Sequence, residues 1–537
     1  MHWRPDHWRV GHAPDVASVL LIFGLAATAV LTFRDYGISN DEGLQQHYGE
    51  LILAYYRSGF SDESVFRFDN LYYYGGLFDI VVVLIGGVVP ADPYSIRHLL
   101  CAFIGIGGIL ATWATARAAA GPRAGFLAGL ALALCGPWYG GMFNHTKDIP
   151  FAAAMIGATY FLLRARRSLP YPKWQHVLGF GLLAGMALGI RVQGLLLFAY
   201  AALMISWWPH QSDAGLRERA RSAGTAALRF APAFLIAYLI MVSAWPWAAL
   251  DALNPLRALN AFQHFHYDIK TIASGEMYVM ATVPRWYVPL YLAVKLHVLM
   301  LVGAIVAVLG LALPRTVGID PLRKDTRLIA LTVAFPLLCQ VATQGPAYTG
   351  LRHFLFVVPA LAALAGIGID LVLNFMERRR RAVANGAAVA LAATCVWYAT
   401  VLVRLHPDEY LFYNPLVGGL ERASGRYETD YWFNTMPEAL KELDRFLART
   451  DKSYAAGPWP KYKVTACSQR LQFEEQAGVR FEWTTDWDQA DFYIAPTHMD
   501  CDRVLDGKII ATVERLGATI AVVKDRRLST TPSIAHQ

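Results

Sequence analysis

The sequence predicts an α-helical polytopic membrane protein with about eleven crossings and a small α/β domain at its C-terminal end. Of its 537 residues, 55% are apolar and the mean hydropathy is +0.33, which is too apolar for an ordinary soluble protein. Long apolar runs recur from Val16 onward and stop near Val403. Many of them approach the roughly 20 residues that cross about 30 Å of hydrocarbon. The residues from Arg404 to Gln537 have mixed polarity, so we expect them to fold in water.

The connections between the apolar runs alternate in charge, and this alternation predicts the topology. Basic residues gather in every second connection, which marks these connections as cytoplasmic. The five basic connections contain, in chain order, Arg117/Arg123; Arg164/Arg166/Arg167/Lys173; Arg217/Arg219/Arg221/Arg229; Arg315/Arg323/Lys324/Arg327; and Arg378 to Arg381. We predict crossings at 16–33, 95–116, 124–139, 149–163, 177–190, 192–206, 230–245, 288–313, 328–341, 354–373 and 387–403.

The N-terminal end carries Arg and His before the first run, and no small-residue cleavage site follows that run. These features predict an uncleaved first helix with a cytoplasmic N-terminus. Eleven crossings then place the tail outside the cytoplasm. The predicted domains are a transmembrane domain at 1–403, whose first external loop is 34–94, and an extracytoplasmic domain at 404–537.

The alternation of basic and external connections also decides how two ambiguous stretches cross the membrane. The segment from Gly179 to Trp208 is too long for one crossing, and basic loops on both sides of it require an even number. Two short helices that meet at Arg191 satisfy this requirement. If the apolar segment from Leu77 to Val89 crossed the membrane, the basic loops that follow it would lie on the external side. We therefore predict an interfacial or re-entrant helix within the first external loop.

In the tail, Pro437 to Ala448 has helical apolar spacing, and three segments have the composition of strands: Lys463–Ala466, Ala490–Ala495 and Ala518–Lys524. Cys467 and Cys501 are the only cysteines of this region. Outside the cytoplasm they could form a disulfide, but the sequence leaves open whether they lie close enough.

The formal charge of +7 is spread over the short cytoplasmic connections. It therefore indicates the orientation of the chain in the membrane and no nucleic-acid partner.

Two adjacent carboxylates, Asp41 and Glu42, follow the first crossing by a few residues. A base at this position could act on a substrate held in the membrane. When a sugar leaves from a lipid phosphate the leaving group is already a stable anion, so a base for the acceptor hydroxyl is needed and an acid is not. The alternative is that both residues are ordinary solvated charges of a loop.

Three further external turns carry polar residues between apolar runs. The first contains His145, Lys147 and Asp148, the second consists of Arg191, and the third ends on Arg352 and His353. The cations Lys147, Arg191 and Arg352 could together bind a lipid phosphate. Each has an ordinary structural alternative: Asp148 before Ile-Pro fits a helix N-cap, and Arg191 fits a side chain that reaches the interface from an apolar helix.

The loop from Ala248 to Tyr287 contains His264, His266 and Asp268. If this segment were a strand, these side chains, at every second position, could bind a divalent metal. No third ligand has a convincing spacing, so an amphipathic surface segment is the favoured interpretation. The cofactor therefore stays unknown, with a divalent metal as one possibility and no metal ligand assigned.

These motifs together resemble the GT-C superfamily of membrane glycosyltransferases, in particular the group of protein O-mannosyltransferases and aminoarabinose transferases (glycosyltransferase family 39 type). The resemblance is carried by the Asp-Glu pair after the first helix, the His-Thr-Lys-Asp turn, the basic residue between two short helices and the Arg-His pair of the last short loop. The tail string Tyr413-Asn414-Pro415-Leu416-Val417-Gly418-Gly419 is similar to the end region of bacterial members.

The resemblance implies an inverting transferase that moves a sugar from a polyprenyl-monophosphate carrier to a lipid, glycan or protein acceptor at the periplasmic face of a bacterial inner membrane. It implies that Asp41 is at or near the catalytic base, that Glu42 supports the placement of the acceptor or of a metal, and that Asp148 is a second acidic site. The basic residues of the later loops would bind the carrier phosphate, and the candidates are His145, Lys147, Arg191, Arg352 and His353.

Two rival functions remain open. A transporter or flippase for a lipid-linked sugar would also place polar residues near helix ends, although transporters commonly have inverted repeats and charges near the midplane. A membrane scaffold without catalytic activity would leave Asp41, Lys147 and Arg191 without a shared purpose.

Overall fold

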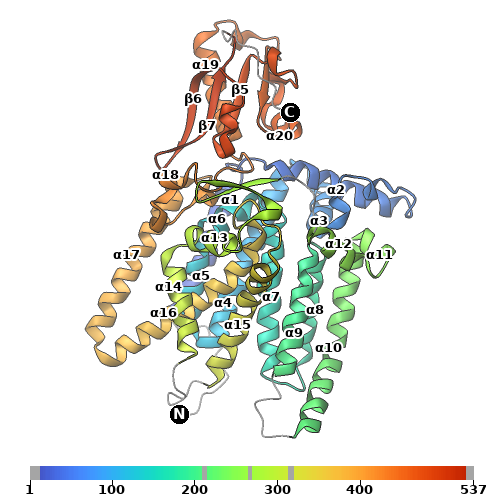
Figure 1. The fold of residues 1–537 in the computed structure, drawn as a ribbon, viewed down its shortest axis with the longest axis vertical. Helices are drawn as coiled ribbons and strands as arrows, with labels where there is room; N and C mark the ends of the chain where they lie inside the picture. Colours follow the sequence, from blue (N-terminus) through green and yellow to red (C-terminus); the bar gives the residue numbers. More distant parts are fainter. Residues whose placement is uncertain (1–12, 208–214, 264–268, 313–319, 528–537) are drawn as a thin grey trace.

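The computed structural model describes residues 13–207, 215–263, 269–312 and 320–527. A bundle of long helices makes up most of the molecule, and a small mixed sheet stands above one end of the bundle (Figure 1). The N-terminal helix begins at the opposite end of the bundle from the sheet. The basic segment before residue 13 and the candidate metal ligands His264, His266 and Asp268 lie outside the described residues.

A helix, or a bent pair of helices, occupies each of the eleven predicted crossings. These helices are α1 (Ala13–Thr32), α4 (Pro93–Ala120), α5 (Pro122–Ala133) with α6 (Gly136–Asn144), α7 (Asp148–Arg166), α8 (Trp174–Leu188), α9 (Leu195–Trp207), α10 (Leu216–Ala244), α13 (Tyr287–Lys295) with α14 (Val298–Gly310), α15 (Asp320–Thr343), α16 (Val358–Arg379) and α17 (Arg381–Leu405).

By length and composition, six helices of the described part could cross a membrane, or up to eight if each bent pair is one crossing. The six are α1, α4, α10, α15, α16 with the preceding turn, and α17. The α5–α6 pair bends by 65° and the α13–α14 pair by 118°. The predicted crossings at 177–190 and 192–206 correspond to shorter apolar helices, α8 and α9.

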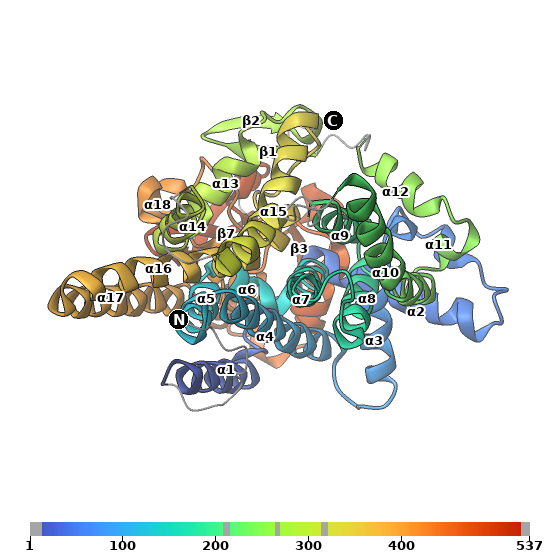
Figure 2. The same ribbon diagram turned by 90° about the horizontal axis from the view of Figure 1, so that it is seen from below.

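The helices differ greatly in how far the protein covers them. The apolar window of α16 is 78% buried, whereas that of α17 is 11% buried. Figure 2 shows why: α16 lies within the bundle, and α17 extends away from it at one edge. Helix α16 is therefore a central packing element, and the apolar surface of α17 faces outward, as expected for a helix in contact with lipid.

The first external loop is mostly helical. It contains α2 (Asn40–Arg57), two 3₁₀ turns (Ser64–Phe66 and Leu71–Tyr73) and α3 (Leu77–Gly86). Helix α3 matches the helix predicted from Leu77 to Val89. Helix α2 was not predicted, because its first half is polar and its one apolar run, residues 51–56, is far shorter than a crossing. Asp41 and Glu42 thus lie in the first turn of a helix rather than in a loop.

The tail contains α19 (Met436–Thr450), α20 (Arg470–Ala477) and a five-stranded sheet of order β4-β3-β5-β7-β6. The strands are β3 (Tyr462–Ala466), β4 (Phe481–Trp483), β5 (Phe492–Pro496), β6 (Lys508–Arg515) and β7 (Ala518–Asp525). β3 pairs in parallel with β4 and β5, and β7 pairs antiparallel with β5 and β6. The predicted helix and three predicted strands correspond to α19, β3, β5 and β7. The sheet and α19 share an apolar core of their own.

The segment between α17 and α19 belongs by packing to the helical bundle. Leu405, Tyr410, Tyr413 and Tyr427 are buried in the same apolar cluster as the long helices. The segment contains the short helix α18 (Gly419–Ala423) and two 3₁₀ turns (Glu409–Leu411 and Pro415–Val417). A disulfide joins Cys467 to Cys501 within the tail, which answers the question that the sequence left open.

Candidate functional site

Five charged residues from distant parts of the chain meet where the first loop covers the bundle, and we call them the charged cluster. They are Asp41, Lys147, Asp148, Arg191 and Arg352. Each lies at or beside a helix end: Asp41 in the first turn of α2, Lys147 and Asp148 at the start of α7, Arg191 directly after α8, and Arg352 in the 3₁₀ segment that leads into α16.

Arg352 connects the two carboxylates of the cluster. Its guanidinium forms an ion pair with Asp41, and its Nε donates to Asp148 Oδ2 at 3.0 Å. The other oxygen of Asp148 is paired with Arg191. The side chain of Asp148 is 3% exposed, whereas that of Asp41 is 33% exposed. Asp148 is therefore enclosed between two guanidinium groups, and Asp41 is the carboxylate that a substrate can reach.

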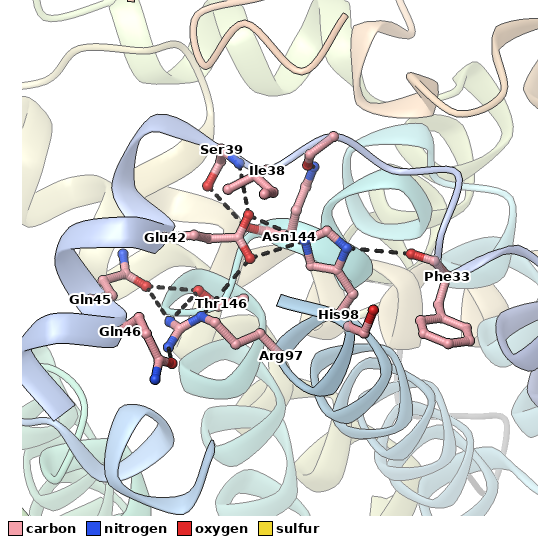
Figure 3. Close-up of polar contacts among 12 residues, drawn as sticks. Phe33, Ile38, Ser39, Glu42, Gln45, Gln46, Arg97, His98, Asn144 and Thr146 are labelled. Carbon is pink, nitrogen blue, oxygen red and sulfur yellow. Dashed lines mark hydrogen bonds and ion pairs between the residues drawn. The ribbon is translucent and has the colours of Figure 1, made fainter. Parts of the chain in front are cut away.

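Glu42 points away from this cluster and is fully buried. Its carboxylate accepts a hydrogen bond from the backbone N–H of Ser39 at 2.7 Å, which caps the first turn of α2. His98 Nε2 lies 3.1 Å from the other oxygen of Glu42, and Arg97 Nε lies 3.9 Å from it (Figure 3). These contacts hold the helix start that carries Asp41.

Lys147 is buried and has an unusual environment. Its ammonium nitrogen lies 4.3 Å from the centre of the Tyr74 ring, and the Arg191 guanidinium lies 5.9 Å from the same ring. No hydrogen bond or ion pair joins this ammonium to another described residue. Burial lowers the pKa of Lys147 to about 8, with the Asp79 carboxylate opposing that change. A buried cation with no carboxylate partner is suited to receive an anion.

The two histidines among the candidates lie beside the cluster. His145 packs against Trp432 with ring centroids 4.1 Å apart, and its ring nitrogens have no hydrogen-bond partner among the described residues. Burial lowers the pKa of His145 to about 3, so its imidazole is neutral near pH 7. His353 stacks against Tyr348 at 4.4 Å. A neutral His145 can offer an anion an N–H group but no positive charge.

The structure also brings in residues that sequence analysis missed. Arg97 and His98 rise from the first turns of α4 toward Glu42, Gln45 and Gln46 of α2 and toward Thr146 (Figure 3). Both lie inside the predicted crossing at 95–116. An arginine and a histidine in an otherwise apolar run are a signal that marks functional candidates, and attention to the external loops alone passed over it.

Tail residues complete the site on its other side. The Arg352 guanidinium carbon lies over the Trp432 ring, 4.2 Å from the centre of that ring. A small cavity beside Arg352 is lined by His145, Lys295, Glu428 and Tyr431, among others. Among the described residues, no group of three or more His, Cys, Asp or Glu side chains could hold a metal ion.

Comparison with known proteins agrees with this architecture. Residues 91–231 match the sequence model of the family described as dolichyl-phosphate-mannose-protein mannosyltransferase. This segment runs from the start of α4 into α10 and contains Arg97, Lys147, Asp148 and Arg191. No curated protein matches the whole chain or a part of it.

Solved structures resemble the chain over nearly its full length. ArnT from Cupriavidus metallidurans bound to undecaprenyl phosphate has a TM-score of 0.51 at 16% identity, over 94% of this chain and 97% of ArnT. The apo state of the same protein gives 0.51 at 15% identity, over 95% and 98%. The archaeal oligosaccharyltransferase AglB from Archaeoglobus fulgidus gives 0.45 at 12% identity, over 89% and 69%. The ArnT matches show that the fold is the GT-C fold, as the resemblance in the sequence predicts.

Proposed function

We propose that this chain, which has the GT-C fold of membrane glycosyltransferases, transfers a sugar from a polyprenyl-monophosphate carrier to an acceptor hydroxyl with inversion at the anomeric carbon. The observation that carries the proposal is the charged cluster, in which one reachable carboxylate lies beside three cations. The fold supports the choice of carrier, because the similar ArnT structure holds undecaprenyl phosphate.

The charges of the cluster suit a phosphodiester. Lys147, Arg191 and Arg352 carry three positive charges, and Asp41 and Asp148 carry two negative ones. The net charge is thus one positive, and it belongs to Lys147, which has no carboxylate partner among the described residues. A carrier phosphate placed between Lys147 and Arg191, over the Tyr74 ring, would balance it.

The proposed reaction uses Asp41 as general base. Asp41 removes the proton of the acceptor hydroxyl, the hydroxyl oxygen forms a bond to the sugar C1, and the bond from C1 to the carrier phosphate breaks. The polyprenyl phosphate leaves with the bonding electrons, and the three cations stabilise the charge that develops on it. Asp148 does not touch the substrate in this scheme and holds Arg191 and Arg352 in place.

The ion pair between Arg352 and Asp41 suggests an order of events. While Arg352 holds Asp41, the guanidinium occupies the carboxylate oxygen that would accept the proton of the acceptor hydroxyl. The carrier phosphate competes for the same guanidinium, so its binding frees Asp41 for the acceptor.

We further propose that the site faces the periplasm of a bacterial inner membrane, with the N-terminus in the cytoplasm. The sugar and the class of acceptor, which is a lipid, a glycan or a protein, are to be identified by experiment.

The decisive experiment compares wild type with Asp41→Asn, purified in detergent at equal folded yield. Radiolabelled polyprenyl-phosphate sugars and acceptors extracted from native membranes serve as substrates. We expect Asp41→Asn to lower turnover by about 10²–10⁴-fold, the range for loss of a general base. Asp62→Asn is the matched control, because Asp62 is a fully exposed carboxylate of the same loop. Equal turnover in wild type and Asp41→Asn would refute the assignment, and carrier binding without any bond cleavage would favour transport.

A further inference from the structure

We propose that Arg97 is a positioning residue that sets the separation between the base and the phosphate-binding cations. This inference rests on the proposed function, and it assigns a role to a residue outside the charged cluster. Arg97 lies in the first turns of α4, and its side chain is fully buried.

The guanidinium of Arg97 contacts all three elements that surround it. It donates from Nη2 to Asp79 Oδ1 of α3 at 2.7 Å, to Gln45 Oε1 of α2 at 3.0 Å and to the Thr146 hydroxyl at 3.0 Å. Thr146 in turn donates to Gln45 Oε1 at 2.7 Å, so helix α2 and the turn before α7 are joined directly as well. Figure 3 shows Gln45 and Thr146 beside this guanidinium.

The elements that Arg97 joins carry opposite parts of the proposed chemistry. Gln45 lies one helical turn after Asp41 on α2, and Thr146 directly precedes Lys147 and Asp148. Movement of α2 relative to the turn would change the distance from Asp41 to a phosphate bound by Lys147. Since the carboxylate oxygen of a base must lie within about 2.6–3.2 Å of the hydroxyl oxygen that it deprotonates, such movement would reduce turnover more than binding.

Arginine is suited to this position and lysine is not. The planar guanidinium presents several N–H groups in fixed directions, whereas a lysine ammonium is a single point of charge. A lysine at position 97 would keep the charge near Asp79, but its side chain is one atom shorter, and its single nitrogen cannot also replace Nη1, which donates to Gln46 Oε1 at 3.5 Å. Because Arg97 is buried with Asp79, its complete removal would also leave the Asp79 carboxylate buried without this ion pair.

The test compares Arg97→Lys with Arg117→Lys in the full-length protein. Arg117 lies in the last turn of the same helix and forms a partly buried ion pair with Asp15, with Nε and Oδ1 2.8 Å apart, at the end of α4 away from the charged cluster. We measure the melting temperature, the turnover of radiolabelled polyprenyl-phosphate sugars and the Kd of undecaprenyl phosphate. We expect Arg97→Lys to lower kcat by about 100-fold, the effect of a displacement near 1 Å, and to change the Kd less than about threefold. Arg117→Lys should keep the wild-type kcat.

A second variant separates positioning from stability. Arg97→Gln with Asp79→Asn removes both charges of the buried pair, so no unpaired charge remains between these two residues, while the contacts to Gln45 and Thr146 are weakened. We expect its kcat to stay low even where its melting temperature approaches that of wild type.

The outcomes are distinct. Recovery of kcat together with stability in the double variant, or equal losses in Arg97→Lys and Arg117→Lys, would overturn the positioning role while the transferase assignment stands. A wild-type protein that cleaves none of the extracted donors would overturn both the proposed function and this inference.

Discussion

At the scale of single residues, the site is a set of buried charges that compensate one another. Asp148 is enclosed by Arg191 and Arg352, and each of these guanidinium groups thereby gains a partner. Burying an unpaired ion costs several kcal/mol, so such groups are expected to be paired or to bind a ligand. Lys147 is the member of the cluster without a carboxylate partner among the described residues, and it is the residue whose environment a carrier phosphate would change most.

The lowered pKa of Lys147 predicts how carrier affinity depends on pH. The free protein has a pKa of about 8 at Lys147. A bound phosphate favours the ammonium form and raises this pKa, so binding takes up a proton when the pH exceeds 8. Affinity for undecaprenyl phosphate should therefore weaken by about twofold from pH 7 to 8 and by about tenfold from pH 7 to 9. The measurement is the Kd at each pH.

The variant Lys147→Arg provides the test of this cause, because arginine keeps its charge to pH values above 12. Its affinity should stay level between pH 7 and 9, whatever its absolute value. Lys147→Met should bind weakly and equally at each pH. A decline above pH 8 that persists in Lys147→Met would assign the titration to another group and exclude Lys147 as the phosphate ligand.

At the scale of elements, the bundle depends on close contact between α14 and α16. A Cβ built on Gly368 of α16 would lie 1.9 Å from the Gly303 carbonyl oxygen of α14, a distance that real side chains do not adopt. Neither residue has room for a methyl group, so small residues set the separation of these two helices. Since the 3₁₀ segment that carries Arg352 leads directly into α16, this packing contributes to the position of the charged cluster.

Gly368→Ala should therefore destabilise the protein by about 1–3 kcal/mol, the usual cost of overpacking. Gly107→Ala on α4 is the matched control, because a Cβ at Gly107 meets no atom within 4 Å. That substitution should be neutral or stabilising, since alanine favours a helix over glycine by up to about 1 kcal/mol. Unfolding by SDS titration measures both. Similar values for the two variants would show that the α14–α16 contact can relax.

The elements also show what the sequence alone could and could not predict. Long apolar runs identified the crossing helices, because lipid imposes length and apolarity together. Helix α2 was missed although Tyr48, Ile52 and Tyr55 follow a helical spacing and are buried in one apolar cluster, because its first half is polar and its apolar run is too short for a crossing. Strands β4 and β6 were missed as well: β4 is a short edge strand, and β6 is an edge strand that is largely exposed along its length.

The candidate site was predictable as a list of residues but not as a geometry. Asp41, Lys147, Asp148, Arg191 and Arg352 were each identified from their position between apolar runs. Their ion pairs could not be, because Asp41 and Arg352 lie 311 positions apart in the chain. Glu42 was grouped with Asp41 because the two are adjacent, yet successive residues of a helix point in different directions. In the structure Glu42 faces Arg97 and His98 instead.

At the scale of the whole molecule, the chain is a membrane bundle with a sheet domain docked on the end that carries the charged cluster (Figure 1). Arg515 of β6 forms an ion pair with Asp408, which directly follows α17, and a second one with Glu438 of α19. Gln472 of α20 donates to the Ile38 carbonyl oxygen at 2.7 Å, just before Asp41. The sheet domain and the site should therefore share one side of the membrane.

The redox state of the sheet-domain cysteines in cells tests which side that is. Cys467 and Cys501 are joined, and their Cα atoms lie 6.2 Å apart. Such bonds persist in the periplasm and are rare in the cytoplasm, where thiols are kept reduced. With the proposed orientation, the pair should be oxidised in growing cells. Lysates denatured in the presence of a polyethylene-glycol maleimide should then show four modified cysteines before reduction, the free Cys101, Cys135, Cys339 and Cys395, and six after it.

The variant Cys467→Ser calibrates this measurement, because it should show five modified cysteines both before and after reduction. Six modified cysteines in the unreduced wild-type protein would mean that the tail is reduced in the cell, and would place the sheet domain and the charged cluster in the cytoplasm. The carrier would then have to be used on the cytoplasmic face, and the basic connections, from Arg117 to Arg381, would lie on the opposite side from the one that positive charge ordinarily selects. Because charge and thiol chemistry are independent physical signals, their agreement would fix the orientation of the site.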